Sequence, residues 1–215
     1  QISHQVKADL VDHLYQGCLS GTITGVIVSI LIYFDFHGYT QTYLLISWLV
    51  VFDIMMLALS MLYFFYMKYR YTIDSVFWEK AYFAMMSGCA VAWVPCVYLM
   101  PNQITRQYLV LLMLFLATAG YATGTIGQFW LCVITLNILL VPLITWSFYQ
   151  GSFFYEIIGI YSVIYMFFLI AINYRTTKWL KESLKLKLEN TLVSYQVNHD
   201  VLTNLPNQRL LPQYI

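Results

Sequence analysis

The stretch FFYEIIGIYSVIYMFFLIAINYRTTKWLKESLKLKLEN, residues 153–190, joins an apolar segment directly to a lysine-rich one. Residues 153–174 carry a single charge, on Glu156, and are long enough to cross a bilayer core, which takes about 20 helical residues. Between Phe153 and Asn198 the only glycine is Gly159 and there is no proline, so no residue of this segment forces the helix to end at the membrane surface. We therefore expect one helix that leaves the membrane and continues as a rod of about 60 Å in total.

The composition of the whole chain is that of an integral membrane protein. Of its 215 residues, 60% are hydrophobic and 10% are charged, whereas charged residues make up about 25% of an ordinary soluble domain. We expect an all-α membrane protein with six transmembrane helices, the last of which continues into a coiled-coil-like signalling helix. The predicted spans are residues 16–36, 42–67, 78–100, 106–121, 128–148 and 153–174.

The basic residues predict the orientation of the chain in the membrane. If the N-terminus is cytoplasmic, six spans place Arg106 on the outer side and the other ten lysines and arginines on the inner side. Cytoplasmic loops carry this excess of positive charge in membrane proteins. We therefore expect both termini to be cytoplasmic. The short connections between the spans leave no room for a further folded domain on the outer side.

The four cysteines are expected to serve as small side chains in the packed core. Cys18, Cys89, Cys96 and Cys132 all lie in apolar runs and have no CxxC spacing, so we expect buried residues of the core and no metal site.

The linker after the sixth span carries an apolar ridge. Leucines recur there every four residues, a spacing that drifts around a straight helix, and a threonine and a tyrosine allow a rough heptad register further on. We expect this ridge to pair with a second copy of the chain. The alternative is a helix whose lysines rest on anionic lipid. The ridge consists of Leu180, Leu184, Leu188, Thr191, Leu192 and Tyr195.

The segment after the linker, HDVLTNLPNQRLL at residues 199–211, is polar and contains turn formers. Pro206 restricts the conformation of the residue before it, so we expect the rod to change direction after Asp200.

This segment resembles the motif that opens GGDEF domains, the diguanylate cyclase family, which has the form D-x-L-T-G-L-P-N-R. Asn204 stands where that motif has glycine, and Gln208 stands where it has the arginine that clasps the aspartate. The matching residues, which would form the hinge, are Asp200, Leu202, Thr203, Leu205, Pro206 and Asn207.

The resemblance implies that a catalytic domain begins at residues 199–215 and continues beyond them, and that it makes cyclic di-GMP from GTP with Mg²⁺. The GGDEF loop itself is not among the 215 residues, so we expect no catalysis and no cofactor in this chain. Because two such domains each present one GTP to the other, the resemblance implies a homodimer through the sixth span and the linker. It also implies a bacterial inner membrane, and no nucleic-acid partner is expected.

These observations divide the chain into four parts. Residues 1–15 are a cytoplasmic lead-in, which we expect to be amphipathic or loosely ordered. A sensor domain at 16–174 follows, then a linker at 175–198 and the start of a GGDEF domain at 199–215. The six spans are similar to MASE-type sensor modules. We expect them to sense a small lipophilic or membrane-embedded signal.

Three residues are candidates for binding that signal. Asp53 lies near the centre of the second span, where a charge costs about 2.5 to 3.5 kcal/mol on insertion and indicates function. Asn137 lies at a comparable depth in the fifth span, and Trp93 lies beside Pro95, which predicts a kink in the third. We expect Asp53 and Asn137 to face the interior of the bundle. The alternative is an interhelical hydrogen bond that only fixes packing.

Two other functions stay open. In a GGDEF–EAL protein the same sensor would control degradation of cyclic di-GMP. A six-span transporter is the remaining alternative, although transporters have repeats and several ionisable groups within the membrane.

Overall fold

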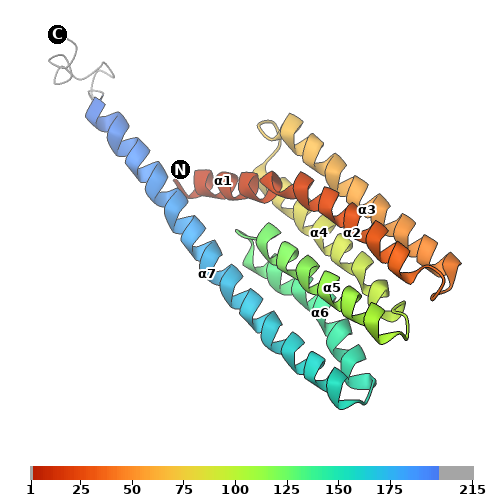
Figure 1. The fold of residues 1–215 in the computed structure, drawn as a ribbon. Helices are drawn as coiled ribbons and strands as arrows, with labels where there is room; N and C mark the ends of the chain where they lie inside the picture. Colours follow the sequence, from red (N-terminus) through yellow and green to blue (C-terminus); the bar gives the residue numbers. More distant parts are fainter. Residues whose placement is uncertain (1, 199–215) are drawn as a thin grey trace, which may run out of the picture.

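The computed structural model describes residues 2–198 of the chain. Within this range the protein is built from helices joined by short turns, and it contains no strand (Figure 1). Six helical stretches of this part are long and apolar enough to cross a membrane, which confirms the predicted all-α class and the number of spans. The helices are α1 (Ile2–Gln16), α2 (Cys18–Phe36), α3 (Thr42–Tyr69), α4 (Ser75–Tyr98), α5 (Ile104–Gly124), α6 (Phe129–Tyr149) and α7 (Phe153–Asn198).

The helices of the first five spans begin and end within three residues of the predicted positions, and α7 begins at the predicted residue, Phe153. The largest differences are at α4, which was predicted at 78–100 and is observed at Ser75–Tyr98, and at α5, which was predicted at 106–121 and is observed at Ile104–Gly124. The hydropathy of the sequence falls at Ala122, Thr123 and Gly124, but a helix ends where its hydrogen bonding ends, and that point does not depend on hydropathy. The predicted spans therefore located the apolar core of each helix more accurately than its ends.

The bundle is centred on α4, which packs between α3 and α6. α2 covers the far side of α3, α7 packs against α6, and α5 contacts α2, α6 and α7. Two helices run through an internal proline, Pro95 in α4 and Pro142 in α6. All four cysteines are buried thiols of this core, as the sequence predicted.

The lead-in is an ordered helix, α1, which lies across one end of the bundle (Figure 1). It packs against α2, α4 and α7. The Tyr15 ring stacks on Tyr66 of α3 with centroids 3.9 Å apart, and the Tyr15 hydroxyl donates a hydrogen bond to the main-chain oxygen of Trp78 at 3.0 Å. We call this the α1 end of the bundle. The opposite end, which carries the α2–α3, α4–α5 and α6–α7 turns, is the distal end.

The last helix, α7, is continuous over 46 residues, from Phe153 to Asn198. At a rise of about 1.5 Å per residue it is about 70 Å long. Its extension passes the α1 end and projects beyond the other helices (Figure 1). This confirms that the sixth span and the linker form one helix. No residue between Lys178 and Tyr195 is fully buried, so the extension is a rod held by the bundle mainly at its base.

Candidate sensing site and helix α7

Asp53 lies at the interface between α3 and α2. Its Oδ1 accepts a hydrogen bond at 2.8 Å from the hydroxyl of Ser29, which is completely buried on α2. The same hydroxyl lies 2.8 Å from the main-chain oxygen of Val26, one turn earlier. Asp53 itself is only half-buried. The carboxylate therefore joins two spans, which is the arrangement expected of the packing alternative.

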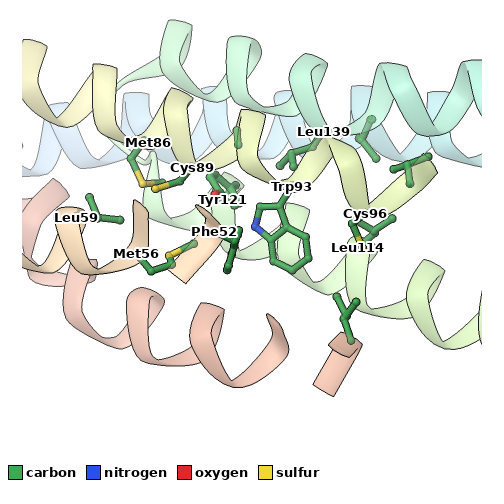
Figure 2. Close-up of a cluster of buried hydrophobic side chains, with 14 of the residues drawn as sticks. Phe52, Met56, Leu59, Met86, Cys89, Trp93, Cys96, Leu114, Tyr121 and Leu139 are labelled. Atoms are coloured by element: carbon green, nitrogen blue, oxygen red, sulfur yellow. The ribbon is translucent and has the colours of Figure 1, made fainter. Parts of the chain in front are cut away.

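Trp93 lies deep in the core, in an aromatic cluster formed by α3 and α4. Its ring meets Phe52 edge to face, with centroids 4.9 Å apart, and Trp48 lies 6.4 Å away. The Trp48 indole nitrogen donates a hydrogen bond to the main-chain oxygen of Ala92 at 2.9 Å. Figure 2 shows the Trp93 indole surrounded by apolar side chains, with the hydroxyl of Tyr121 in the same cluster.

The indole nitrogen of Trp93 and the hydroxyl of Tyr121 make no hydrogen bond of good geometry, although the two side chains interact with each other. Trp93 is 2% exposed and Tyr121 is 7% exposed, so water does not replace the missing partner at the surface. A buried polar atom without a partner costs about 1 to 3 kcal/mol. The Trp93 region therefore holds two polar atoms deep in an apolar core, and a role for Trp93 in binding the signal stays a prediction.

Asn137 lies half-buried on α6. Its side-chain nitrogen donates a hydrogen bond at 2.7 Å to the main-chain oxygen of Val133, on the same helix. Within residues 2–198, no hydrogen bond or ion pair joins any two of Asp53, Trp93 and Asn137. The structure thus places them on α3, α4 and α6 with separate partners, and a common binding site for the three stays a prediction.

The distal end carries an ion pair that the sequence did not indicate. Arg106 at the start of α5 lies 2.9 Å from Oδ1 of Asp35 at the end of α2, and it also donates to the main-chain oxygen of Asp35. The guanidinium lies over the ring of Tyr39, 3.8 Å from its centroid. The side chains of Arg106 and Asp35 are 24% and 14% exposed, so this pair is shielded from solvent. The sequence feature that could have predicted this pair is the opposite charge of Asp35 and Arg106, which lie beside turns at the same end of the bundle.

Two ion pairs fasten α1 to the bundle. Asp12 lies 2.9 Å from Arg70, which follows α3, and it accepts a hydrogen bond at 3.0 Å from the hydroxyl of Tyr66. Lys7 lies 2.9 Å from Glu79 in the first turns of α4. These contacts hold α1 against the ends of α3 and α4.

α7 is fastened to the turn between α5 and α6 at the level where it leaves the bundle. The side-chain nitrogen of Asn173 donates to the main-chain oxygen of Ala122 at 2.7 Å and lies 3.4 Å from the hydroxyl of Thr125. The main-chain nitrogen of Gly127 donates to the hydroxyl of Thr177 at 3.0 Å. Asn173 and Thr177 are 1% and 4% exposed. We call these contacts the α7 anchor.

The α7 anchor depends on a glycine and is covered by α1. Gly127 has a φ of +107°, a conformation that side chains with a Cβ adopt only under strain. Leu10 of α1 lies over this turn, with its Cδ2 3.5 Å from the position that a Cβ on Gly127 would occupy. The elements α1, α5, α6 and α7 therefore meet at one point. Sequence reasoning missed this site, although an asparagine followed by a threonine one turn later, at the end of an apolar span, was visible.

The predicted dimer residues divide into two groups. Leu180, Leu184 and Leu188 are half-buried and follow Asn173 and Thr177 at spacings of three, four and seven residues, which keeps them on the same face of the helix. That face is turned toward the bundle and toward α1, which packs against α7. The remaining residues, Thr191, Leu192 and Tyr195, are exposed.

The predicted hinge residues lie outside the residues that the structure describes. They are Asp200, Leu202, Thr203, Leu205, Pro206 and Asn207.

No protein-family model matches this chain, and no curated protein and no solved structure matches it either. The described residues define the class: an all-helical protein with six helices apolar enough to span a membrane and a rigid helix that leaves the bundle. The features on which a function can be built are the Trp93 region, the α7 anchor and the extension of α7.

Proposed function

We propose that this chain is the membrane part of a signal receptor that controls a following GGDEF domain, which makes cyclic di-GMP from GTP with Mg²⁺. The observation that supports this most strongly is the continuity of α7. It is a single helix from Phe153 to Asn198, and the residues that resemble the opening motif of a GGDEF domain begin at Asp200. A movement of the bundle would therefore reach the start of the catalytic domain through one rigid element.

The α7 anchor is the proposed coupling point within the bundle. Because Asn173 and Thr177 hold α7 to the α5–α6 turn, a displacement of α5 or α6 moves α7 as well. The signal is a small lipophilic or membrane-embedded molecule, and Asp53, Asn137 and Trp93 are its candidate contacts. The signal controls the receptor if it binds one conformation of the bundle more tightly than the other. A tenfold higher affinity for one conformation shifts the equilibrium between the two by about 1.4 kcal/mol.

The proposed receptor is a homodimer in the bacterial inner membrane, with both ends of the chain in the cytoplasm. The common position of α1 and the α7 extension at one end of the bundle (Figure 1) supports this orientation. That end also carries Lys7, Arg70 and the lysines of the extension, which agrees with the preference of basic residues for the cytoplasmic side.

The decisive experiment uses the protein with the sequence that follows Ile215 in its gene, purified into lipid nanodiscs. We expect a GGDEF-type motif in that sequence and formation of cyclic di-GMP from GTP and Mg²⁺, measured by chromatography. Degradation of cyclic di-GMP would identify the GGDEF–EAL alternative. Absence of both the motif and the activity would overturn the proposal and leave the transporter alternative.

The role of α7 is tested by changing its helical phase. Two alanines inserted after Lys187 rotate the part of α7 beyond them by about 200°. Seven inserted residues rotate it by almost two full turns, so that its faces end only about 20° from their original direction. We expect the two-residue insertion to change cyclic di-GMP output strongly and the seven-residue insertion to leave it within about twofold of the parent, because only the latter preserves facing surfaces. Equal outputs from both variants would show that α7 does not transmit orientation.

Asp53 is tested separately with Asp53→Asn, which removes the charge and keeps an oxygen that accepts from Ser29. If Asp53 contacts the signal, the cyclic di-GMP response to the stimulus falls while the protein stays folded. The matched control is Asp74→Asn, at an exposed turn residue. An unchanged response in a folded Asp53 variant would remove Asp53 from the sensing site.

A further inference from the structure

Beyond the α7 anchor, α7 has an exposed apolar stripe that is distinct from the leucine ridge. Trp179, Leu186 and Val193 are 77%, 59% and 56% exposed, and they are separated by seven residues each. Seven residues are about two turns of an α-helix, so the three side chains lie along one line. Three large apolar residues aligned in this way on a helix outside the apolar spans form a candidate contact surface for a second helix.

This stripe faces away from the bundle. Leu186 follows Leu184 by two positions, which is about 200° around the helix. Leu184 is half-buried on the face that continues the α7 anchor, whereas Leu186 is exposed. Because α1 and the bundle occupy the first face, a partner can approach the second without displacing α1.

The residues around the stripe follow a heptad repeat. With the stripe at the d positions, the intervening a positions are small or polar. One of them, Asn190, is the residue type that specifies register in parallel two-stranded coiled coils when it stands at a single a position. The d positions are Ile172, Trp179, Leu186 and Val193, and the a positions are Thr176, Ser183 and Asn190.

The flanking charges complement a second copy of the same helix. In this register Glu182 is at a g position and Lys187 is at the following e position. In a parallel pair, the g residue of one helix approaches the e residue five positions later on the other helix. Two symmetry-related pairs of opposite charge therefore form. Within one chain Glu182 lies 3.9 Å from Lys178, and both side chains are more than half exposed, so this contact is too weak to hold Glu182 in place.

We infer that a second copy of this chain packs in parallel on the stripe Trp179, Leu186 and Val193, aligned by Asn190 and by Glu182 to Lys187 pairs. The inference deepens the proposed function, on which its regulatory meaning rests, by assigning the face through which two copies meet. The leucine ridge at Leu180 and Leu184 belongs to the contact of α7 with its own chain.

The test is crosslinking of single introduced cysteines in the full chain in native membranes. Leu186→Cys places a thiol on the stripe, and the matched control Leu184→Cys places one on the ridge. The native cysteines are all buried. We expect at least about fivefold more crosslinked dimer from Leu186→Cys, because d residues of a parallel pair face each other. Equal or greater crosslinking from Leu184→Cys would overturn the assignment, and so would absence of crosslinking from both variants.

The charge pairing is tested in the Leu186→Cys background with Glu182→Lys, Lys187→Glu and both together. Each single change puts like charges opposite each other and is expected to lower the dimer yield about threefold, and the double change restores opposite charges and the yield. If the double variant gave no more crosslinked dimer than either single variant, the proposed pairing of Glu182 with Lys187 of the second copy would be wrong. These positions are exposed, and elution of each variant as a folded species on size exclusion is the control. The measurement needs no catalytic domain, so its failure is separate from failure of cyclic di-GMP synthesis.

Discussion

The side-chain nitrogen of Asn173 on α7 lies 2.7 Å from the main-chain oxygen of Ala122 in the last turn of α5. The last carbonyl groups of an α-helix have no partner within the helix. At the end of α5 two of them are satisfied by side chains of other spans, Ala122 by Asn173 and Gly124 by the hydroxyl of Tyr82, at 2.9 Å. The end of α5 is therefore completed by α4 and α7.

Replacement of Asn173 is expected to destabilise the bundle. Asn173→Leu keeps the size of the side chain but removes the 2.7 Å hydrogen bond to the oxygen of Ala122, which then keeps only the longer bond from the hydroxyl of Thr125 at 3.3 Å. We expect this to cost about 0.5 to 2 kcal/mol. Asn137→Leu is the control, because Asn137 bonds to Val133 of its own helix and should cost less. Unfolding in mixed detergent micelles containing SDS measures both. If the two variants lost the same free energy of unfolding, the bond from Asn173 to Ala122 would stabilise the bundle no more than a bond within one helix.

Substitution of Gly127 is expected to strain the same turn. Gly127→Ala forces a residue with a Cβ into a φ of +107°, at a cost of about 1 to 2 kcal/mol. The space itself is adequate, since the nearest atom to the new Cβ would be 3.5 Å away. Gly120→Ala is the matched control, because no atom lies within 4 Å of a Cβ added there. Alanine within a helix is favoured over glycine by about 0.5 to 1 kcal/mol, so the two variants should shift stability in opposite directions.

The Asp35 to Arg106 pair is expected to stabilise the distal end. Arg106→Gln leaves a shielded carboxylate without its cation and should cost about 1 to 3 kcal/mol. Asp35→Asn together with Arg106→Gln should cost less than the sum of the single changes, because the double variant leaves no unpaired charge. Thermal unfolding of the four proteins gives the coupling energy. A coupling energy near zero would show that the ion pair does not stabilise the distal end.

The hydrogen bond from Ser29 to Asp53 is expected to contribute modestly. Ser29→Ala removes it and should lower stability by about 0.6 kcal/mol, the average for hydrogen bonds between membrane helices, and by no more than about 1.7 kcal/mol. Ser47→Ala is the control, because the Ser47 hydroxyl bonds only to the main-chain oxygen of Leu44 in its own helix. If both variants unfold alike, the contact between α2 and α3 is not stabilising.

The spans and the continuity of α7 were predictable because they depend on local sequence. The length of an apolar run sets whether a helix crosses a bilayer, and the absence of proline and further glycine after Gly159 lets α7 continue to Asn198. The burial of the cysteines follows from the same apolar runs. These properties need no knowledge of which helices are neighbours.

The contacts that join the helices were not predictable in this way. Asp12 and Arg70 lie 58 residues apart in the sequence, and the residues around each of them do not indicate that the other is its partner. The depth of Asp53 was visible, but its partner Ser29 depended on α2 lying beside α3. The ridge at Leu184 was visible too, but its position on the same face as Asn173 and Thr177, which contact the bundle, depended on how α7 packs.

The docking of α1 also orders the assembly of the chain. α1 is synthesised before the residues it holds or covers, such as Arg70, Glu79 and Gly127. Its contacts with α3, α4 and the α5–α6 turn can therefore form only after those later parts of the chain have been made. Docking of α1 thus requires helices that are synthesised after it, and we expect protease resistance of α1 to appear only when those helices are in place.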